Sequence, residues 1–214
     1  MASPRPRVER LLPTPEAEEL IGLARELAAA ELAPRAAEYE AEARFPREVF
    51  RTLGRAGLLG LVYPEEHGGG GQPYEVYLQV LEELATAWLS VGIGVSVHTL
   101  ACHPIARYGT ARQQAELLPD MLGGELLGAY CLSEPQSGSD AAALVTKAVL
   151  EPGPDGEDSG TWVVDGRKAW ITHGGVADFY ALMVRTGGPG PRGISCLLAD
   201  ASTPGLSAAT PEHK

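Results

Sequence analysis

Apolar residues recur at helical spacing along the first half of the chain, which predicts a bundle of helices. Thr14 is a suitable N-cap, and Pro15 suits the first position of a helix. Thr110 and Gln113 form a capping box that opens another helix. We expect helices to begin near residues 14, 46, 74, 89 and 110. Residues 89–107 are nearly all apolar or small, so they should lie in the middle of the bundle.

At Gly123 and Gly124 the apolar period changes from helical to alternating, which is typical of strands. The expected strands are residues 126–132, 143–150, 161–164, 167–172, 179–185 and 193–198. Asp165 and Gly166 form a hairpin signal between the third and fourth of them. Several strands joined by turns predict a small antiparallel barrel or sandwich. The sequence therefore predicts three parts: a flexible arm (residues 1–13), a helical domain (residues 14–123) and a β domain (residues 124–214).

Composition narrows the possible functions. The formal net charge of -11 argues against a nucleic-acid partner, because phosphate binding needs clustered Lys and Arg. We find no apolar run long enough to span a membrane, and residues 1–12 lack the apolar core of a signal peptide. The cysteines and histidines fit no zinc spacing, so we expect no metal site. Without an export signal, reduced thiols and a cytoplasmic location are the default expectation.

The segment from Tyr130 to Asp140 carries the most chemistry. A short apolar strand runs into a loop in which Pro135 ends the pairing and Gly138 permits a tight turn. The loop offers backbone N–H groups and three hydroxyls, those of Ser133, Ser137 and Ser139. Such a loop can hold an anionic ligand or one that takes several hydrogen bonds. An ordinary surface turn is the alternative.

Three ordered segments carry family-like motifs. Residues 130–140 read Tyr-Cys-Leu-Ser-Glu-Pro-Gln-Ser-Gly-Ser-Asp, residues 64–71 read Pro-Glu-Glu-His-Gly-Gly-Gly-Gly, and residues 168–174 read Lys-Ala-Trp-Ile-Thr-His-Gly. In this order and spacing they resemble the signatures of the acyl-CoA dehydrogenase family, and the resemblance covers the chain from about residue 14 to residue 214. The chain departs from the family pattern at His67, where Tyr or Phe is usual, and at His173, which replaces Asn.

The resemblance implies an α+β multidomain fold, in which an all-α N-terminal domain precedes an antiparallel β-barrel or sandwich middle domain. It also implies an FAD-dependent oxidoreductase of fatty acid metabolism that converts an acyl-CoA thioester to its 2-enoyl form. Electron-transfer flavoprotein is the implied electron acceptor, and the family is homo-oligomeric, typically tetrameric. Two other functions stay open: an acyl-CoA oxidase or flavin monooxygenase on the same scaffold, and a non-catalytic remnant that serves as a binding module.

The resemblance also implies the residues that contact the flavin: Tyr130, Leu132, Ser133, Ser139, Trp170, Ile171 and Thr172. Ser139 would lie between FAD and the acyl-CoA substrate. An indole such as that of Trp170 can cover one flavin face, and the Thr172 hydroxyl can bond the ring edge. Without the resemblance, Trp170 on a strand would be a core residue, and Thr172 would only close a turn.

Glu134 and the glycines after His67 each have a structural alternative to a functional role, and the catalytic Glu of the family is not found. Glu134 invites the role of catalytic base, but as a loop residue ahead of Pro135 it is expected to bond the local backbone. The glycines after His67 either form a specific loop or only a flexible connector. In the family, the catalytic Glu lies in a C-terminal helical domain, and no part of this sequence resembles that domain. We therefore assign no catalytic residue. We expect the chain to be a truncated fragment that is inactive alone, and we do not carry the family's oligomeric state over to it.

Overall fold

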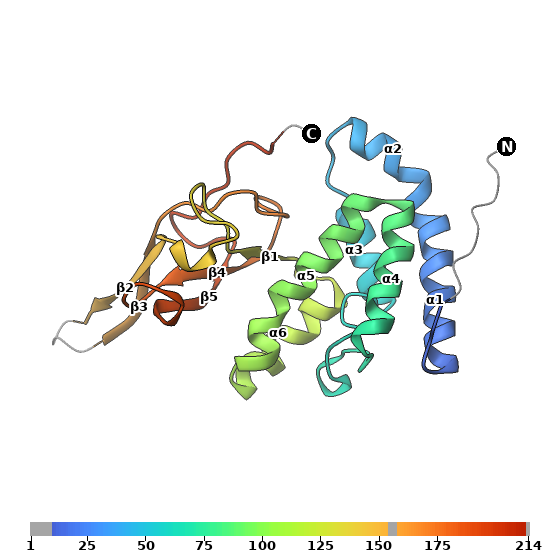
Figure 1. The fold of residues 1–214 in the computed structure, drawn as a ribbon, viewed down its shortest axis with the longest axis horizontal. Coiled ribbons are helices and arrows are strands. Elements are labelled where there is room, and N and C mark those ends of the chain that lie inside the picture. Colours follow the sequence, from blue (N-terminus) through green and yellow to red (C-terminus); the bar gives the residue numbers. More distant parts are fainter. Residues whose placement is uncertain (1–9, 154–157, 213–214) are drawn as a thin grey trace. The chain divides into compact units, whose positions relative to one another are not determined.

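The computed structural model describes residues 10–153 and 158–212, and these divide into two units (Figure 1). The first unit ends at Val95 and the second begins at Ser96, so the division falls inside one long helix, α5 (Leu89–Tyr108). The domain limits expected at residues 123 and 124 stay a prediction. Of the expected arm, residues 1–9 lie outside the described residues, and Arg10 forms ion pairs with Glu82 and Glu83.

The first unit is helical, as the apolar spacing predicts. Its complete helices are α1 (Pro15–Leu27), α2 (Ala33–Ala41), α3 (Arg47–Arg55) and α4 (Tyr74–Ala87), and the π-helical turn η1 (Ala28–Leu32) joins the first two. The Thr14 hydroxyl accepts a hydrogen bond from the Ala17 N–H group (3.2 Å), which confirms the expected N-cap. α1 packs against α4, and the core of the unit includes the buried side chains of Ile21, Phe50, Leu53 and Leu84.

The apolar helix α5 corrects one expectation from the sequence. With 20 residues and a mean hydropathy of 1.3, it is long and apolar enough to cross a membrane, although no such segment was expected. Half of this stretch is buried inside the protein. That burial is the pattern of a central helix, which agrees with the expected place of residues 89–107.

The glycine-rich loop is closely bonded and is not merely a flexible connector. It follows the 3-10 turn η2 (Glu65–His67), and the N–H groups of residues 69–72 donate to carbonyl groups of residues 60–64 at 2.7–3.0 Å. Gly69 passes so close to Tyr63 that a Cβ atom at position 69 would lie 2.1 Å from the Tyr63 carbonyl oxygen. Only glycine fits this position without movement of the backbone.

The second unit combines α6 (Ala111–Gly123) with a five-stranded sheet. Thr110 and Gln113 form the predicted capping box of α6. The strands are β1 (Gly128–Cys131), β2 (Lys147–Pro152), β3 (Asp158–Asp165), β4 (Phe179–Arg185) and β5 (Ile194–Asp200). β4 is central, because it pairs with β5 along its whole length, with β1 over its first four residues and with β2 at Arg185.

The expected sequence of a helical part and a β part is confirmed, but the sheet is mixed and not antiparallel throughout. β1 and β2 run parallel to β4, whereas the pairs β2–β3 and β4–β5 are antiparallel. Long connections, and not a tight hairpin turn, lead into β4, and such connections permit parallel pairing. Within the described ranges the sheet does not close into a barrel. One of its faces buries the side chains of Ala129, Cys131, Tyr180, Leu182 and Val184.

Residues 167–172, expected to be a strand, form none. Trp170 has a left-handed backbone (φ 57°), and the Ala169 N–H group bonds to the Ser133 carbonyl oxygen instead of a neighbouring strand. The hairpin expected at Asp165 and Gly166 is therefore wrong. β3 pairs back onto β2 across a connection of which residues 154–157 lie outside the described part of the chain.

The expected strand 143–150 also begins later than predicted. Residues 141–143 form the 3-10 turn η3 (Ala141–Ala143), and β2 starts only at Lys147. A second short turn, η4 (Pro191–Gly193), leads into β5.

Two glycines provide a test of the helical unit. Gly22 lies inside α1 with open space around its Cβ position, so Gly22→Ala should raise the free energy of unfolding by about 0.5–1 kcal/mol. Gly69→Ala should lower it by about 1–3 kcal/mol, because the new Cβ atom overlaps the Tyr63 carbonyl group. Urea denaturation followed by circular dichroism measures both changes. A Gly69→Ala variant as stable as the natural chain would contradict this packing.

Candidate functional site

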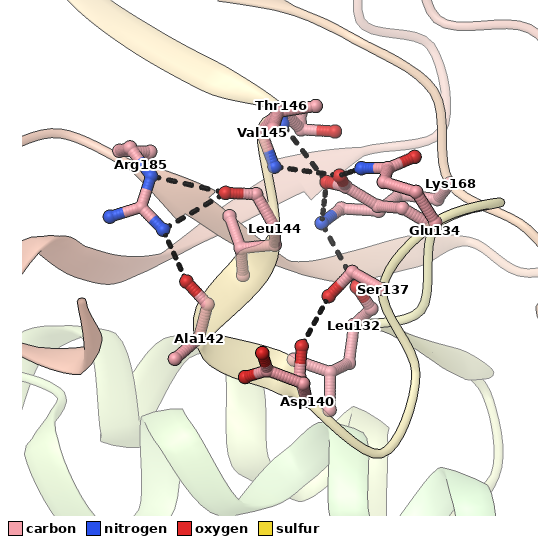
Figure 2. Close-up of polar contacts among 11 residues, drawn as sticks. Leu132, Glu134, Ser137, Asp140, Ala142, Leu144, Val145, Thr146, Lys168 and Arg185 are labelled. Atoms are coloured by element: carbon pink, nitrogen blue, oxygen red, sulfur yellow. Dashed lines mark hydrogen bonds and ion pairs between the residues drawn. The ribbon is translucent and has the colours of Figure 1, made fainter. Parts of the chain in front are cut away.

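The loop between β1 and β2 is closed by a buried carboxylate (Figure 2). We call residues 132–146 the signature loop. Glu134 is 1% exposed, and its Oε2 atom accepts hydrogen bonds from the Val145 N–H group (2.7 Å) and the Gln136 side-chain amide (2.7 Å). Its Oε1 atom accepts one from the Thr146 N–H group (3.0 Å). Glu134 therefore bonds the local backbone, as predicted, and these bonds explain why β2 starts only at Lys147.

Lys168 supplies the positive charge beside this carboxylate. Its Nζ atom lies 2.8 Å from Glu134 Oε1, and the Lys168 side chain is only 10% exposed. Burial on its own raises the pKa of Glu134, but the hydrogen bonds from Lys168, Thr146 and Val145 outweigh burial and lower the pKa to about 2. Glu134 is therefore ionised at neutral pH and has no free lone pair directed toward a ligand.

Other groups hold the rest of the signature loop. The buried Ser137 hydroxyl donates to the Asp140 carbonyl oxygen (2.8 Å), so it is not one of the hydroxyls available to a ligand. Arg185, at the end of β4, donates to the carbonyl oxygens of Ala142 (2.8 Å) and Leu144 (2.9 Å). Neither Lys168 nor Arg185 was singled out from the sequence. A long cationic side chain gives no sign of its partner until the fold is known.

The structure brings the two motif segments of the β unit together. We call residues 167–173 the tryptophan segment. The Ala169 N–H group donates to the Ser133 carbonyl oxygen (2.9 Å), and Lys168 Nζ donates to the Leu132 carbonyl oxygen (3.1 Å). The residues that follow Ala169 therefore lie beside the end of β1.

The expected site residues differ in what they can offer to a ligand. Ser133 is half-buried and Ser139 is exposed, and neither hydroxyl has a partner among the described residues. Tyr130 is half-buried on β1. Ile171 packs against the apolar cluster of the sheet, and its carbonyl oxygen accepts a hydrogen bond from the Gly174 N–H group (2.9 Å). Leu132 and Thr172 are half-buried.

Trp170 is the most unusual of these residues. Its side chain is 68% exposed, and its backbone adopts φ 57°, a conformation that costs a residue with a Cβ atom about 1–2 kcal/mol. Strain of this kind collects at functional sites, where the surrounding structure holds it in place. An exposed indole in strained backbone is not the core residue that the alternative from the sequence requires.

Histidine at position 173 adopts the same left-handed region, with φ 67°. Its side chain is buried, and its Nδ1 atom lies 2.9 Å from the Gly128 carbonyl oxygen, so the ring donates there. The Gly128 N–H group donates to His98 Nδ1 (2.9 Å), while His98 Nε2 lies 2.8 Å from the Met121 carbonyl oxygen. His98 is thus the neutral tautomer with its proton on Nε2, and two imidazoles hold the first residue of β1.

Two cavities open in the second unit. One of about 410 Å³ lies between the turn 174–177 and residues 201–211, and one of about 240 Å³ is lined by residues of α6, β4 and β5. None of the expected flavin residues lines either cavity. The expected flavin residues lie outside these two cavities, on β1, the signature loop and the tryptophan segment, and among the described residues no cluster of metal ligands is found.

Comparison with protein families shows to which family this chain belongs. The description "Acyl-CoA dehydrogenase, N-terminal domain" matches residues 14–125, and "Acyl-CoA dehydrogenase, middle domain" matches residues 129–214. The chain belongs to the acyl-CoA dehydrogenase family. The closed signature loop lies within the matched middle domain.

Known relatives agree with the family match. The chain is 38% identical to the mitochondrial isobutyryl-CoA dehydrogenase of Bos taurus over 93% of its own length and 46% of that protein. It is 34% identical to an acyl-CoA dehydrogenase of Bacillus subtilis, over 90% of the chain and 49% of the relative. Butyryl-CoA dehydrogenase of Megasphaera elsdenii has a similar structure, with 30% identity and a TM-score of 0.82 over 92% of this chain and 51% of that one.

A cofactor is seen in one similar structure. Glutaryl-CoA dehydrogenase of Mycobacterium smegmatis, solved in complex with FADH2, is 27% identical with a TM-score of 0.83, over 94% of this chain and 49% of that one. The chain spans about half the length of the relatives it matches. Because the relatives include mitochondrial proteins, the cytoplasmic location stays a prediction.

The Glu134 pair gives the second unit a defined pH dependence. The folded pKa of about 2 lies below the ordinary value of 4.5, so the stabilisation is complete above pH 4.5 and is lost as the pH falls toward 2. We expect Glu134→Gln to be less stable than the natural chain at about pH 6, and the difference in unfolding free energy to shrink by about pH 3. Glu116→Gln, which removes the carboxylate of an exposed pair with Arg112, is the matched control.

The strain at Trp170 can be measured with two substitutions. Trp170→Gly should be more stable than Trp170→Ala by about 1 kcal/mol, because glycine adopts positive φ freely and alanine does not. At Trp162, inside β3, the order should reverse, because glycine weakens a strand. Urea denaturation of the four variants checks both orders. Equal stability of the two Trp170 variants would contradict the strain.

Proposed function

We propose that this chain binds FAD on the surface formed by the signature loop and the tryptophan segment, and that the whole protein is an acyl-CoA dehydrogenase. The observation that carries the proposal is the Ala169–Ser133 hydrogen bond, which joins the segment of the exposed, strained Trp170 to the end of β1. There the Ser133 hydroxyl has no partner among the described residues. The reaction would take an acyl-CoA thioester to its 2-enoyl form. The bound flavin would supply the hydride acceptor.

The residues present fit a flat, polar aromatic group. The indole of Trp170 offers a face for stacking, and Ser133, Ser139 and Thr172 offer hydroxyls that donate or accept. The Glu134 carboxylate is turned inward and neutralised by Lys168, so this buried charge does not repel the phosphates of an anionic cofactor. We infer that Tyr130, Leu132 and Ile171 complete the contact. Ser139, which is exposed on the signature loop, is the proposed contact to the acyl-CoA.

Glu134 does not serve as the base that removes the substrate proton. A general base works best when its pKa lies near the working pH, whereas the pKa of Glu134 is about 2. Its oxygens already accept four hydrogen bonds. We assign the base to no residue among those described, so the role of this half is to bind and orient.

Electron-transfer flavoprotein is the proposed electron acceptor. A chain in the structure of the electron transferring flavoprotein of Acidaminococcus fermentans resembles this one with a TM-score of 0.81 and 30% identity, over 92% of this chain and 50% of that one. This likeness supports an association of the two kinds of protein.

Titration of the chain with FAD, followed by quenching of flavin fluorescence, tests the proposal. Trp170→Ala should raise the Kd about 3- to 10-fold through lost stacking. Thr172→Val should raise it by a similar factor through one lost hydrogen bond, about 3- to 10-fold. Trp162→Ala, which removes an exposed indole from β3, is the control and should leave the Kd unchanged. The absence of quenching by the natural chain, or equal Kd values for all variants, would refute the site.

A further inference from the structure

We propose that Lys168 is a positioning residue that sets the tryptophan segment against the signature loop, so that flavin affinity depends on its ammonium group. This inference rests on the proposed function, because the two segments are flavin-binding only by that proposal. The Lys168 side chain is 10% exposed and points into the protein toward Glu134 (Figure 2).

The attachment has three points on consecutive residues. Lys168 Nζ donates to the Leu132 carbonyl oxygen at 3.1 Å and to Glu134 Oε1 at 2.8 Å. Between them, the Ser133 carbonyl oxygen accepts from the Ala169 N–H group at 2.9 Å. Three bonds in a row fix both the distance and the rotation of one segment against the other. The next residue along the chain is Trp170, so its strained backbone begins directly at this attachment.

The bonds that close the signature loop do not need Lys168. Glu134 also accepts from the Val145 and Thr146 N–H groups, and those bonds lie within the loop itself. Lys168 is thus the side chain that adds a link between segments 34 residues apart. A lost Lys168 should therefore release the tryptophan segment and leave the loop closed.

Stability alone is a weak reason for such a pair. Moving an ammonium and a carboxylate group out of water costs about as much free energy as their attraction returns. Replacing a buried ion pair with apolar residues is therefore frequently neutral for stability. What the pair adds is direction, since an ammonium group with two fixed acceptors holds its chain in one place. A strained Trp170 needs such a constraint, because strained backbone persists only where its surroundings determine it.

The test compares Lys168→Met with Lys147→Met, a matched substitution of an exposed lysine on β2. The first measurement needs no cofactor: amide hydrogen exchange by NMR. In Lys168→Met, the Ala169 amide should exchange about 10-fold faster, the factor that corresponds to about 1.4 kcal/mol. The Val145 and Thr146 amides should keep their protection. Lys147→Met should change none of the three.

The second measurement is flavin binding. Lys168→Met should raise the Kd for FAD about 10-fold and alter the visible circular dichroism of the bound flavin. Lys168→Met leaves the buried Glu134 charge without its cation, which lowers the stability of the fold. The double variant Glu134→Gln, Lys168→Met removes both charges and avoids this penalty. It should fold and still bind FAD weakly. Natural affinity in the double variant would show that only the unpaired charge mattered, and would overturn the proposal.

The two measurements separate this inference from the proposed function. Unchanged Ala169 exchange in Lys168→Met overturns the positioning role, whatever the chain does with FAD. Faster Ala169 exchange together with an unchanged Kd and an unchanged flavin spectrum also overturns it, because the link would then be structural only. A natural chain that binds no FAD refutes the proposed function and, with it, the claim that Lys168 positions flavin residues.

Discussion

The buried carboxylate of Glu134 is the group on which the arrangement of the second unit depends. An ionised carboxylate away from water costs several kcal/mol unless charges and hydrogen bonds compensate it. Here two backbone N–H groups, a side-chain amide and the Lys168 ammonium do so. The loop closes because its own backbone supplies two of these donors. The tryptophan segment lies beside the loop because it supplies the ammonium.

The sheet follows from the same requirement. The N–H groups of Val145 and Thr146 donate to Glu134 and not to a neighbouring strand, so the pairing of β2 begins only after these residues. The Ala169 N–H group bonds to the loop, so the chain between β3 and β4 cannot form another strand. It turns through the left-handed residues Trp170 and His173 and enters β4 parallel to β1. The site is thus made by residues that the sheet leaves out.

Membership of the acyl-CoA dehydrogenase family relates this arrangement to a binding function. The chain matches the N-terminal and middle domains and spans about half the length of its relatives. Its described residues offer an aromatic face, free hydroxyls and a neutralised carboxylate, which suit binding and orientation. Glu134 is not placed as a proton acceptor, since its carboxylate is held ionised by four hydrogen bonds. The departure at His173 is accommodated, because its ring bonds to the start of β1.

The sequence by itself determined the features that depend on neighbours a few residues away. The N-cap at Thr14, the capping box at Thr110, the helical first half and the family motifs could all be read from it. Only the tertiary structure decided that residues 167–172 are no strand, that the sheet is mixed, and that the Ser137 hydroxyl is already engaged. The physical reason is the separation along the chain of the residues that interact. Caps and periodicity act within one turn, whereas the bond between Lys168 and Glu134 joins residues 34 positions apart and exists only when the fold has closed.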